Sequence, residues 1–238
     1  MSHVLATRTF SQASPVERLS ALRGVLLYTV VGLAIASVSG VISALAIAPV
    51  ILSGGMFGMI IILAAMYGGQ FMGIKLASGP NPHLGLLVGS TLMGVAMGPM
   101  LYVAWLFGLQ GAGNGFALIG QAMGLTVLTA VGMLGYVWTE KRDFSLLRAG
   151  LSAMILPMIA LMVIGLFFPS AMGTGGLGLV FAGAFVLFSA GALLYELNNV
   201  VHSVDNDRVI LASFMLTVSI LVLFWNILSL LMRLQGRD

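Results

Sequence analysis

The chain has 238 residues, of which 60% are hydrophobic and only 7% charged, and its mean hydropathy is +1.11. Soluble domains carry about 25% charged residues, so this composition excludes a water-soluble domain and indicates a protein that crosses a membrane several times. Ten Lys and Arg against seven Asp and Glu residues give a net charge of +3, and the basic residues form no basic face, which disfavours nucleic acid as a partner. There is no cysteine, so neither disulfides nor cysteine metal sites are available.

The first 23 residues come before any long apolar run. They are polar and show no strong helical periodicity, so we expect a cytoplasmic tail over residues 1–23 and a single transmembrane domain over residues 24–238. The stretch ALAIAP (44–49) contains the A-x-A pattern of a signal-peptide cleavage site. Because the sequence before it is longer than a signal peptide, we expect an uncleaved first helix.

Long uncharged stretches predict the membrane spans, since a helix crosses the hydrocarbon layer in about 20 residues. Two spans are expected between Gly24 and Ile74, where Pro49 and Ser53-Gly54-Gly55 interrupt the apolar run. Five more are expected, separated by polar or glycine-rich loops, near residues 84–107, 116–138, 148–168, 177–201 and 209–232. The predicted fold is an all-α integral membrane protein with a bundle of seven transmembrane helices.

The distribution of positive charge predicts the orientation in the membrane. If the N-terminus is cytoplasmic and the spans alternate, the cytoplasmic side receives Arg8, Arg18, Arg23, Lys75, Lys141, Arg142, Arg148 and Arg208. Only Arg233 and Arg237 fall on the other side, so the positive-inside rule predicts a cytoplasmic N-terminus and a periplasmic C-terminus. Tyr136 and Trp138 lie where an aromatic belt is expected, just before the charged segment EKRD.

Several patterns resemble functional motifs without the context that those motifs need. GTGGLG (173–178) matches the dinucleotide-binding pattern, but no βαβ unit surrounds it, so we expect a loop between two spans. His3, His83 and His202 are far apart, and DND (205–207) lacks the other ligands of a calcium loop. We therefore expect no enzyme activity, cofactor or metal site.

Two segments have the small-xxx-small spacing that lets membrane helices approach closely. They are GVAMG (94–98) and GQAMG (120–124). In a chain with 31 glycines such matches arise by chance, so they support helix packing only in general terms.

Glu196 is the only acidic or basic residue well inside a predicted span. A carboxyl group in hydrocarbon costs several kcal/mol unless it is paired, protonated or hydrated, so it is a candidate for function; a purely structural role in joining helices is the alternative. Asn199 shares its helix face. Ser219 and Asn226 lie in the last span, which must run antiparallel to it, so we predict a polar, ion-sensing seam of Glu196, Asn199, Ser219 and Asn226.

The hairpin LLYELNNVVH…LTVSILVLFWNILSLLMRLQG resembles the C-terminal hairpin of the Bax inhibitor-1 (TMBIM) family. MGVAMGPML and AAMYGGQF are also similar to segments of that family, and KRDFSLL resembles its bacterial YccA-like branch. The resemblance implies a seven-helix bundle with the last helix in the centre. It also implies a bacterial inner-membrane protein that modulates the FtsH membrane protease, with residues 1–23 as the part that the protease engages.

The alternative that the family offers is a pH-sensitive calcium or proton leak. Its calcium-leak members carry one aspartate in the sixth helix and another in the seventh. Here those positions are Glu196 and Ser219, and a carboxyl group with a hydroxyl cannot share a proton as two carboxyl groups do. This difference favours the protease modulator, with a leak gated at Glu196 as the second hypothesis.

Overall fold

The structure is a computed structural model that describes residues 15–111, 114–139, 145–167, 176–202 and 208–235. These residues contain no strand and form eight α-helices: α1 (Pro15–Ala46), α2 (Ala48–Ser53), α3 (Met56–Ala77), α4 (Pro82–Gly111), α5 (Ala117–Thr139), α6 (Ser145–Phe167), α7 (Gly176–His202) and α8 (Val209–Gln235). All except α2 have 22 residues or more. The seven long helices confirm the predicted bundle.

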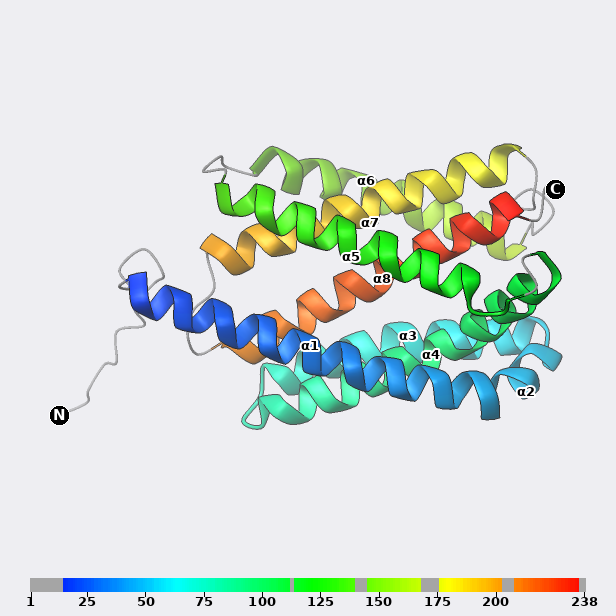
Figure 1. Cartoon of the computed structure of the whole chain (residues 1–238), viewed down its shortest axis with the longest axis horizontal. Helices are drawn as coiled ribbons and strands as arrows, with labels where there is room; N and C mark the ends of the chain where they lie inside the picture. Colours follow the sequence, from blue (N-terminus) through cyan, green and yellow to red (C-terminus); the bar gives the residue numbers. More distant parts are fainter. Residues whose placement is uncertain (1–14, 112–113, 140–144, 168–175, 203–207, 236–238) are drawn as a thin grey trace.

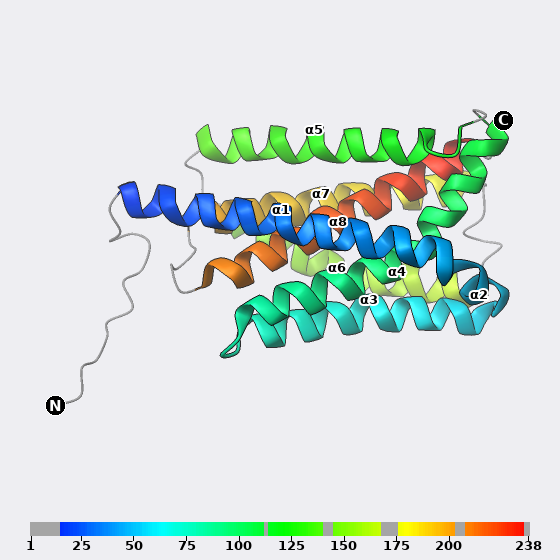
Figure 2. The same cartoon turned by 60° about the horizontal axis from the view of Figure 1, so that its bottom comes forward.

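The long helices lie side by side along the longest axis of the molecule, and α8 runs through the middle of the bundle (Figures 1 and 2). α8 contacts α1, α3, α4, α5 and α7, whereas α6 packs mainly on α7. The last helix is therefore central, as the family resemblance implies. α1 begins at one end of the bundle and α8 ends at the opposite end (Figure 1).

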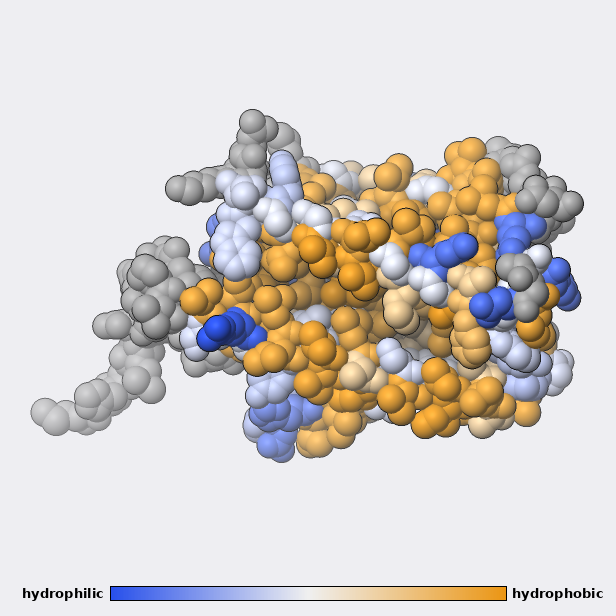
Figure 3. Space-filling view, viewed as in Figure 1, coloured by the Kyte–Doolittle hydropathy of each residue, from blue (hydrophilic) through white to orange (hydrophobic). Residues whose placement is uncertain are grey.

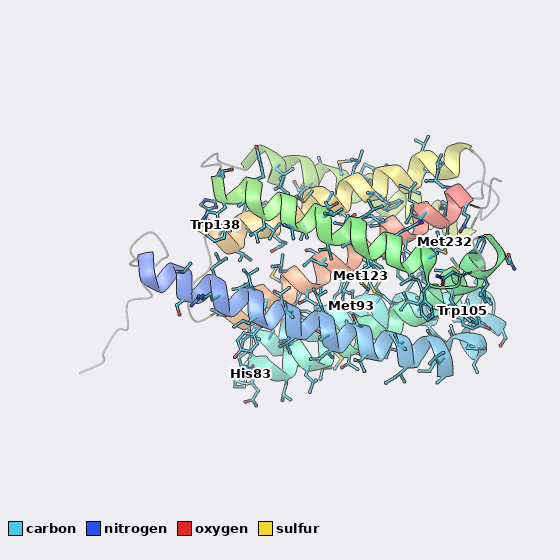
Figure 4. The ribbon with its side chains drawn as sticks, viewed as in Figure 1. His83, Met93, Trp105, Met123, Trp138 and Met232 are labelled. Atoms are coloured by element: carbon cyan, nitrogen blue, oxygen red, sulfur yellow. The ribbon has the colours of Figure 1, made fainter. Side chains whose placement is uncertain are left out.

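The outside of the bundle suits a bilayer. Six helices are long and apolar enough to cross a membrane, and in α6 the apolar stretch Ala149–Ala160 is shorter. Hydrophobic residues cover most of the middle of the molecule, while hydrophilic residues gather toward its ends (Figure 3). Trp105 and Trp138 lie near opposite ends (Figure 4), where the two interfaces of a membrane are expected. The protein is thus a multi-pass membrane protein.

The chain turns between α1 and α3 at the breakers that the sequence predicts. Pro49 lies in the first turn of α2, where its missing N–H group costs no helical hydrogen bond. Gly55, with a φ of 55°, directly precedes α3 and adopts a left-handed conformation that other residues avoid. These two residues allow a tight reversal at the end of the bundle.

α1 begins at Pro15, earlier than the sequence predicts. Residues 15–23, the second part of the predicted tail, thus belong to this helix. Ala21 and Val25 are buried in the same hydrophobic cluster as Leu197 of α7, which explains why the helix continues beyond the apolar run. Only residues 1–14 come before α1, and they lie outside the described residues.

α1 and α4 approach each other along the α1–α4 seam, which we define as Ala36, Ser43, Gly94 and Gly98. A Cβ atom added at Gly94 would overlap the carbonyl oxygen of Ala36, and one added at Gly98 would overlap the side chain of Ser43. Ser43 Oγ also donates a hydrogen bond of 2.8 Å across the seam to the carbonyl oxygen of Val95. The first small-xxx-small segment is therefore used for packing within the chain.

The second small-xxx-small segment is not used in this way. A Cβ atom added at Gly120 or Gly124 of α5 would meet no atom within 4 Å. Identical spacing therefore has two outcomes in one chain, because only the glycines of the first segment lie against another helix.

Phe214 joins the central helix to α3 and α4. Its side chain is fully buried, and its ring lies where a Cβ atom at either Gly73 or Gly89 would stand. The two glycines thus form a slot for one aromatic ring, which fixes α8 against both helices.

Candidate functional site

α7 directs one stripe of side chains into the bundle. Leu193, Leu197 and Val200 are buried at spacings of four and three residues, which is the periodicity of one helix face. Glu196 lies at the border of this stripe and is half-buried. It is six residues from His202, the last residue of α7, or about 9 Å along the helix axis. It is also the only acidic residue whose side chain the structure describes.

The other three predicted site residues, Asn199, Ser219 and Asn226, are half-buried as well. Ser219 and Asn226 are seven residues apart and share one face of α8. Because α7 and α8 pack on each other, the fold brings together the two helices that carry all four residues. Within the part of the chain that the structure describes, no hydrogen bond or ion pair joins any two of them. The polar seam stays a prediction.

A different polar group lies where α1, α4 and α8 meet, and the sequence did not reveal it. We define this hydroxyl cluster as Thr29, Ser90, Ser213 and Thr217, all of which are buried. Thr29 Oγ1 donates to the carbonyl oxygen of Ser213 at 3.4 Å, and Thr217 Oγ1 donates to that of Thr29 at 3.5 Å. These are weak links between α1 and α8, because their lengths are at the limit of hydrogen bonding.

Most hydroxyl groups in this cluster are satisfied by their own helix. Thr29, Ser213 and Thr217 each donate to the carbonyl oxygen four residues earlier, at 2.8, 2.6 and 2.8 Å. Ser90 Oγ is buried without a partner. Isolated Ser and Thr residues are ordinary in membrane helices, so the sequence gives no clear sign of this cluster. The i, i+4 spacing of Ser213 and Thr217 is the one signal that could have pointed to it.

The remaining candidate motifs are described only in part. The ring of His83 contacts that of Tyr28 at a tilt of 59°, with centroids 5.5 Å apart, and His202 Nδ1 lies 3.2 Å from the carbonyl oxygen of Asn198. Residues 176–178 of GTGGLG form the first turn of α7, while the rest of that motif, His3 and DND lie outside the described residues. In the described ranges, no three His, Cys, Asp or Glu residues are grouped as metal ligands.

These features together define a helical multi-pass membrane protein with a central last helix and one half-buried carboxyl group inside a span. Comparison with known proteins gives the family. Residues 18–236 match the family described as "Inhibitor of apoptosis-promoting Bax1", so the chain belongs to the Bax inhibitor-1 family.

Three relatives show the range of the similarity. "Modulator of FtsH protease YccA" of Escherichia coli K12 is 31% identical over 174 residues, which are 73% of this chain and 74% of that protein. An "Uncharacterized membrane protein" of Vibrio cholerae is 29% identical over 234 residues, 98% of this chain and 99% of the relative. "Bax inhibitor 1" of Schizosaccharomyces pombe is 30% identical over 121 residues, which are 51% of this chain and 44% of that protein.

Proposed function

We propose that the protein modulates an FtsH-type protease of the bacterial inner membrane without catalysing a reaction itself. The similarity to a bacterial relative named as a modulator of that protease supports this proposal. In this proposal residues 1–23 face the cytoplasm and present a segment that the protease engages. The bundle that follows, residues 24–238, resists being pulled out of the membrane.

The packing of α1 is the structural observation that carries the proposal. α1 is the helix that directly follows the N-terminal residues, and it packs on both α4 and the central α8. A protease that pulls on the N-terminus must therefore extract α1 before any other helix. Extraction of α1 requires that its contacts with α4 at the α1–α4 seam are broken. Slow extraction would occupy the protease and spare other membrane substrates.

The lifetime of a known membrane substrate of the protease tests the proposal directly. We expect the substrate to live longer in cells that produce the full-length protein than in cells that lack it, in proportion to the amount produced. Pulse-chase measurement in cells with and without FtsH gives both lifetimes. An unchanged substrate lifetime at a high level of folded protein would contradict the proposal.

A leak for protons or calcium is the second candidate, and Glu196 is the observation that favours it. Its carboxyl group is half-buried inside a span, and no described residue forms a hydrogen bond or ion pair with it. Such intramembrane carboxyl groups are found on ion pathways. Under this candidate, Glu196 would gate the flux, with Asn199, Ser219 and Asn226 beside it.

Replacement of Glu196 by glutamine separates the two candidates. Glutamine keeps the shape of the side chain and cannot be ionised, so we expect the variant to fold and to be at least as stable as the unaltered protein. We also expect the lifetime of the protease substrate to stay the same. Flux of protons and calcium into liposomes, measured for both variants and for empty liposomes, is the decisive comparison. Flux that requires the protein and disappears with Glu196→Gln would establish the leak.

A further inference from the structure

The first turns of α1 pack against the ends of α7 and α8. α1 begins, α7 ends and α8 begins at the same end of the bundle (Figures 1 and 2). Ala21 and Val25 of α1 are 6% and 0% exposed. They share a hydrophobic cluster with Leu197 and Val200 of α7, and Val209 of α8 packs against this cluster. We define the N-terminal anchor as Ala21, Gly24, Val25, Leu197, Val200 and Val209.

α1 and α8 approach closely in this anchor. A Cβ atom added at Gly24 would lie 3.1 Å from Cγ1 of Val209, the first residue of α8. Nearby side chains on other faces of α1 are open, since Leu19 is 50% and Leu27 is 68% exposed. Contact with the last two helices therefore selects the buried face of the first helix at this end of the bundle.

The anchor comes before the other buried contacts of α1 on the way from the N-terminus. Among the side chains that the structure describes, Ala21 and Val25 are the first two that are buried. The residues of the α1–α4 seam, Ala36 and Ser43, come later in the same helix. A force applied to the N-terminus therefore reaches the anchor first. α1 cannot slide out unless the apolar side chains of the anchor leave their cluster, which is unfavourable in water.

We propose that the N-terminal anchor is the first barrier to extraction of the protein by its N-terminus. The proposal rests on the proposed function, in which a protease pulls on this end of the chain. It assigns a role to the pair of helices α7 and α8: the last two helices hold the first one in place. The α1–α4 seam is loaded only after the anchor has broken.

A single-molecule force measurement tests the anchor without the protease. The full-length protein is pulled by its N-terminus out of a supported bilayer with an atomic force microscope, and the length of chain released locates each barrier. Val25→Ala removes two methyl groups from the anchor, and Val137→Ala removes the same groups from α5, at an equally buried valine of the same cluster. We expect Val25→Ala to raise the rate of the first step about ten-fold. Val137→Ala should leave the first step unchanged, although both variants should lower the temperature of thermal unfolding. An equal effect of the two variants on the first step, or no effect of either, would overturn the proposal.

A disulfide across the anchor gives a second test, which does not depend on the folding of Val25→Ala. The chain has no cysteine, so Gly24→Cys together with Val209→Cys introduces a single pair of thiols. Their Cβ atoms would be at most about 4.6 Å apart, and disulfides join Cβ atoms about 3.5–4.5 Å apart. We expect oxidation to abolish the first step at the force that breaks it in the reduced protein, and a reductant to restore it. A first step that the disulfide leaves unchanged would contradict the proposal.

Degradation by purified FtsH distinguishes failure of this inference from failure of the proposed function. The same variants are placed in vesicles with the protease and ATP, and the loss of full-length protein is followed over time. We expect Val25→Ala to be degraded several-fold faster than Val137→Ala. If the force measurement separates the two variants and degradation does not, the anchor is supported and engagement of the N-terminus by the protease is contradicted.

Discussion

Replacing Gly94 by leucine is expected to force α1 away from α4 and to destabilise the bundle. The new side chain would meet the carbonyl oxygen of Ala36 and the hydroxyl of Ser39, and backbone atoms cannot move aside as a flexible side chain can. Overpacking of this kind costs about 1–3 kcal/mol, and we expect the upper part of that range here. Thermal unfolding of the purified protein in detergent measures the loss.

Gly124→Leu is the matched control for this prediction. Gly124 also belongs to a small-xxx-small segment inside a long helix, but a Cβ atom there meets nothing within 4 Å. We expect its thermal unfolding to match that of the unaltered protein. Equal destabilisation by both changes would show that close packing at the α1–α4 seam does not decide the outcome, since the change from glycine to leucine favours the helix equally at both positions.

The same pair of variants connects the seam to the proposed function. If slow extraction of α1 occupies the protease, Gly94→Leu should shorten the lifetime of the protein in cells that contain FtsH and should reduce the protection of other substrates. Gly124→Leu should change neither. A shorter lifetime that persists in cells without FtsH would show that another protease removes the unstable variant.

Deletion of residues 2–14 is the second change with a large expected effect. α1 begins at Pro15, so this deletion leaves the helix and its packing intact. If the protease engages the N-terminal residues, the shortened protein should persist longer than the full-length protein. The lifetime of the other substrate should return to its value in cells that lack the protein. Pulse-chase measurement of both proteins gives the result.

A variant with an N-terminal tail of equal length tests whether the protease needs only a long enough tail or a specific sequence. Residues 2–14 are replaced by thirteen glycine and serine residues, which stay flexible and carry no specific sequence. If length alone lets the protease begin, this variant should behave like the full-length protein, and if the sequence is recognised it should behave like the deletion. Unchanged lifetimes for both the deletion and the replacement would refute engagement through the tail.

The candidate site was only partly predictable. Glu196 stands out in the sequence because a charge inside a long apolar run is rare, and the structure places it half-buried at the border of the buried stripe of α7. The hydroxyl cluster of Thr29, Ser90, Ser213 and Thr217 was missed. Its members come from three helices far apart in the chain, and a short polar side chain looks the same in sequence wherever its helix face points.

The sequence by itself determined the class of the protein, the number of long helices and the places where the chain turns. These properties depend on the length of apolar runs and on breakers such as Pro49 and Gly55, which act through local backbone geometry. Only the tertiary structure decided which faces meet: it uses Gly94 and Gly98, and it leaves Gly120 and Gly124 open. It also extended α1 back to Pro15, because Ala21 and Val25 pack against distant helices. Every helix here is apolar on nearly all sides, so hydrophobic periodicity cannot mark the buried face, and close fit between particular neighbours selects it.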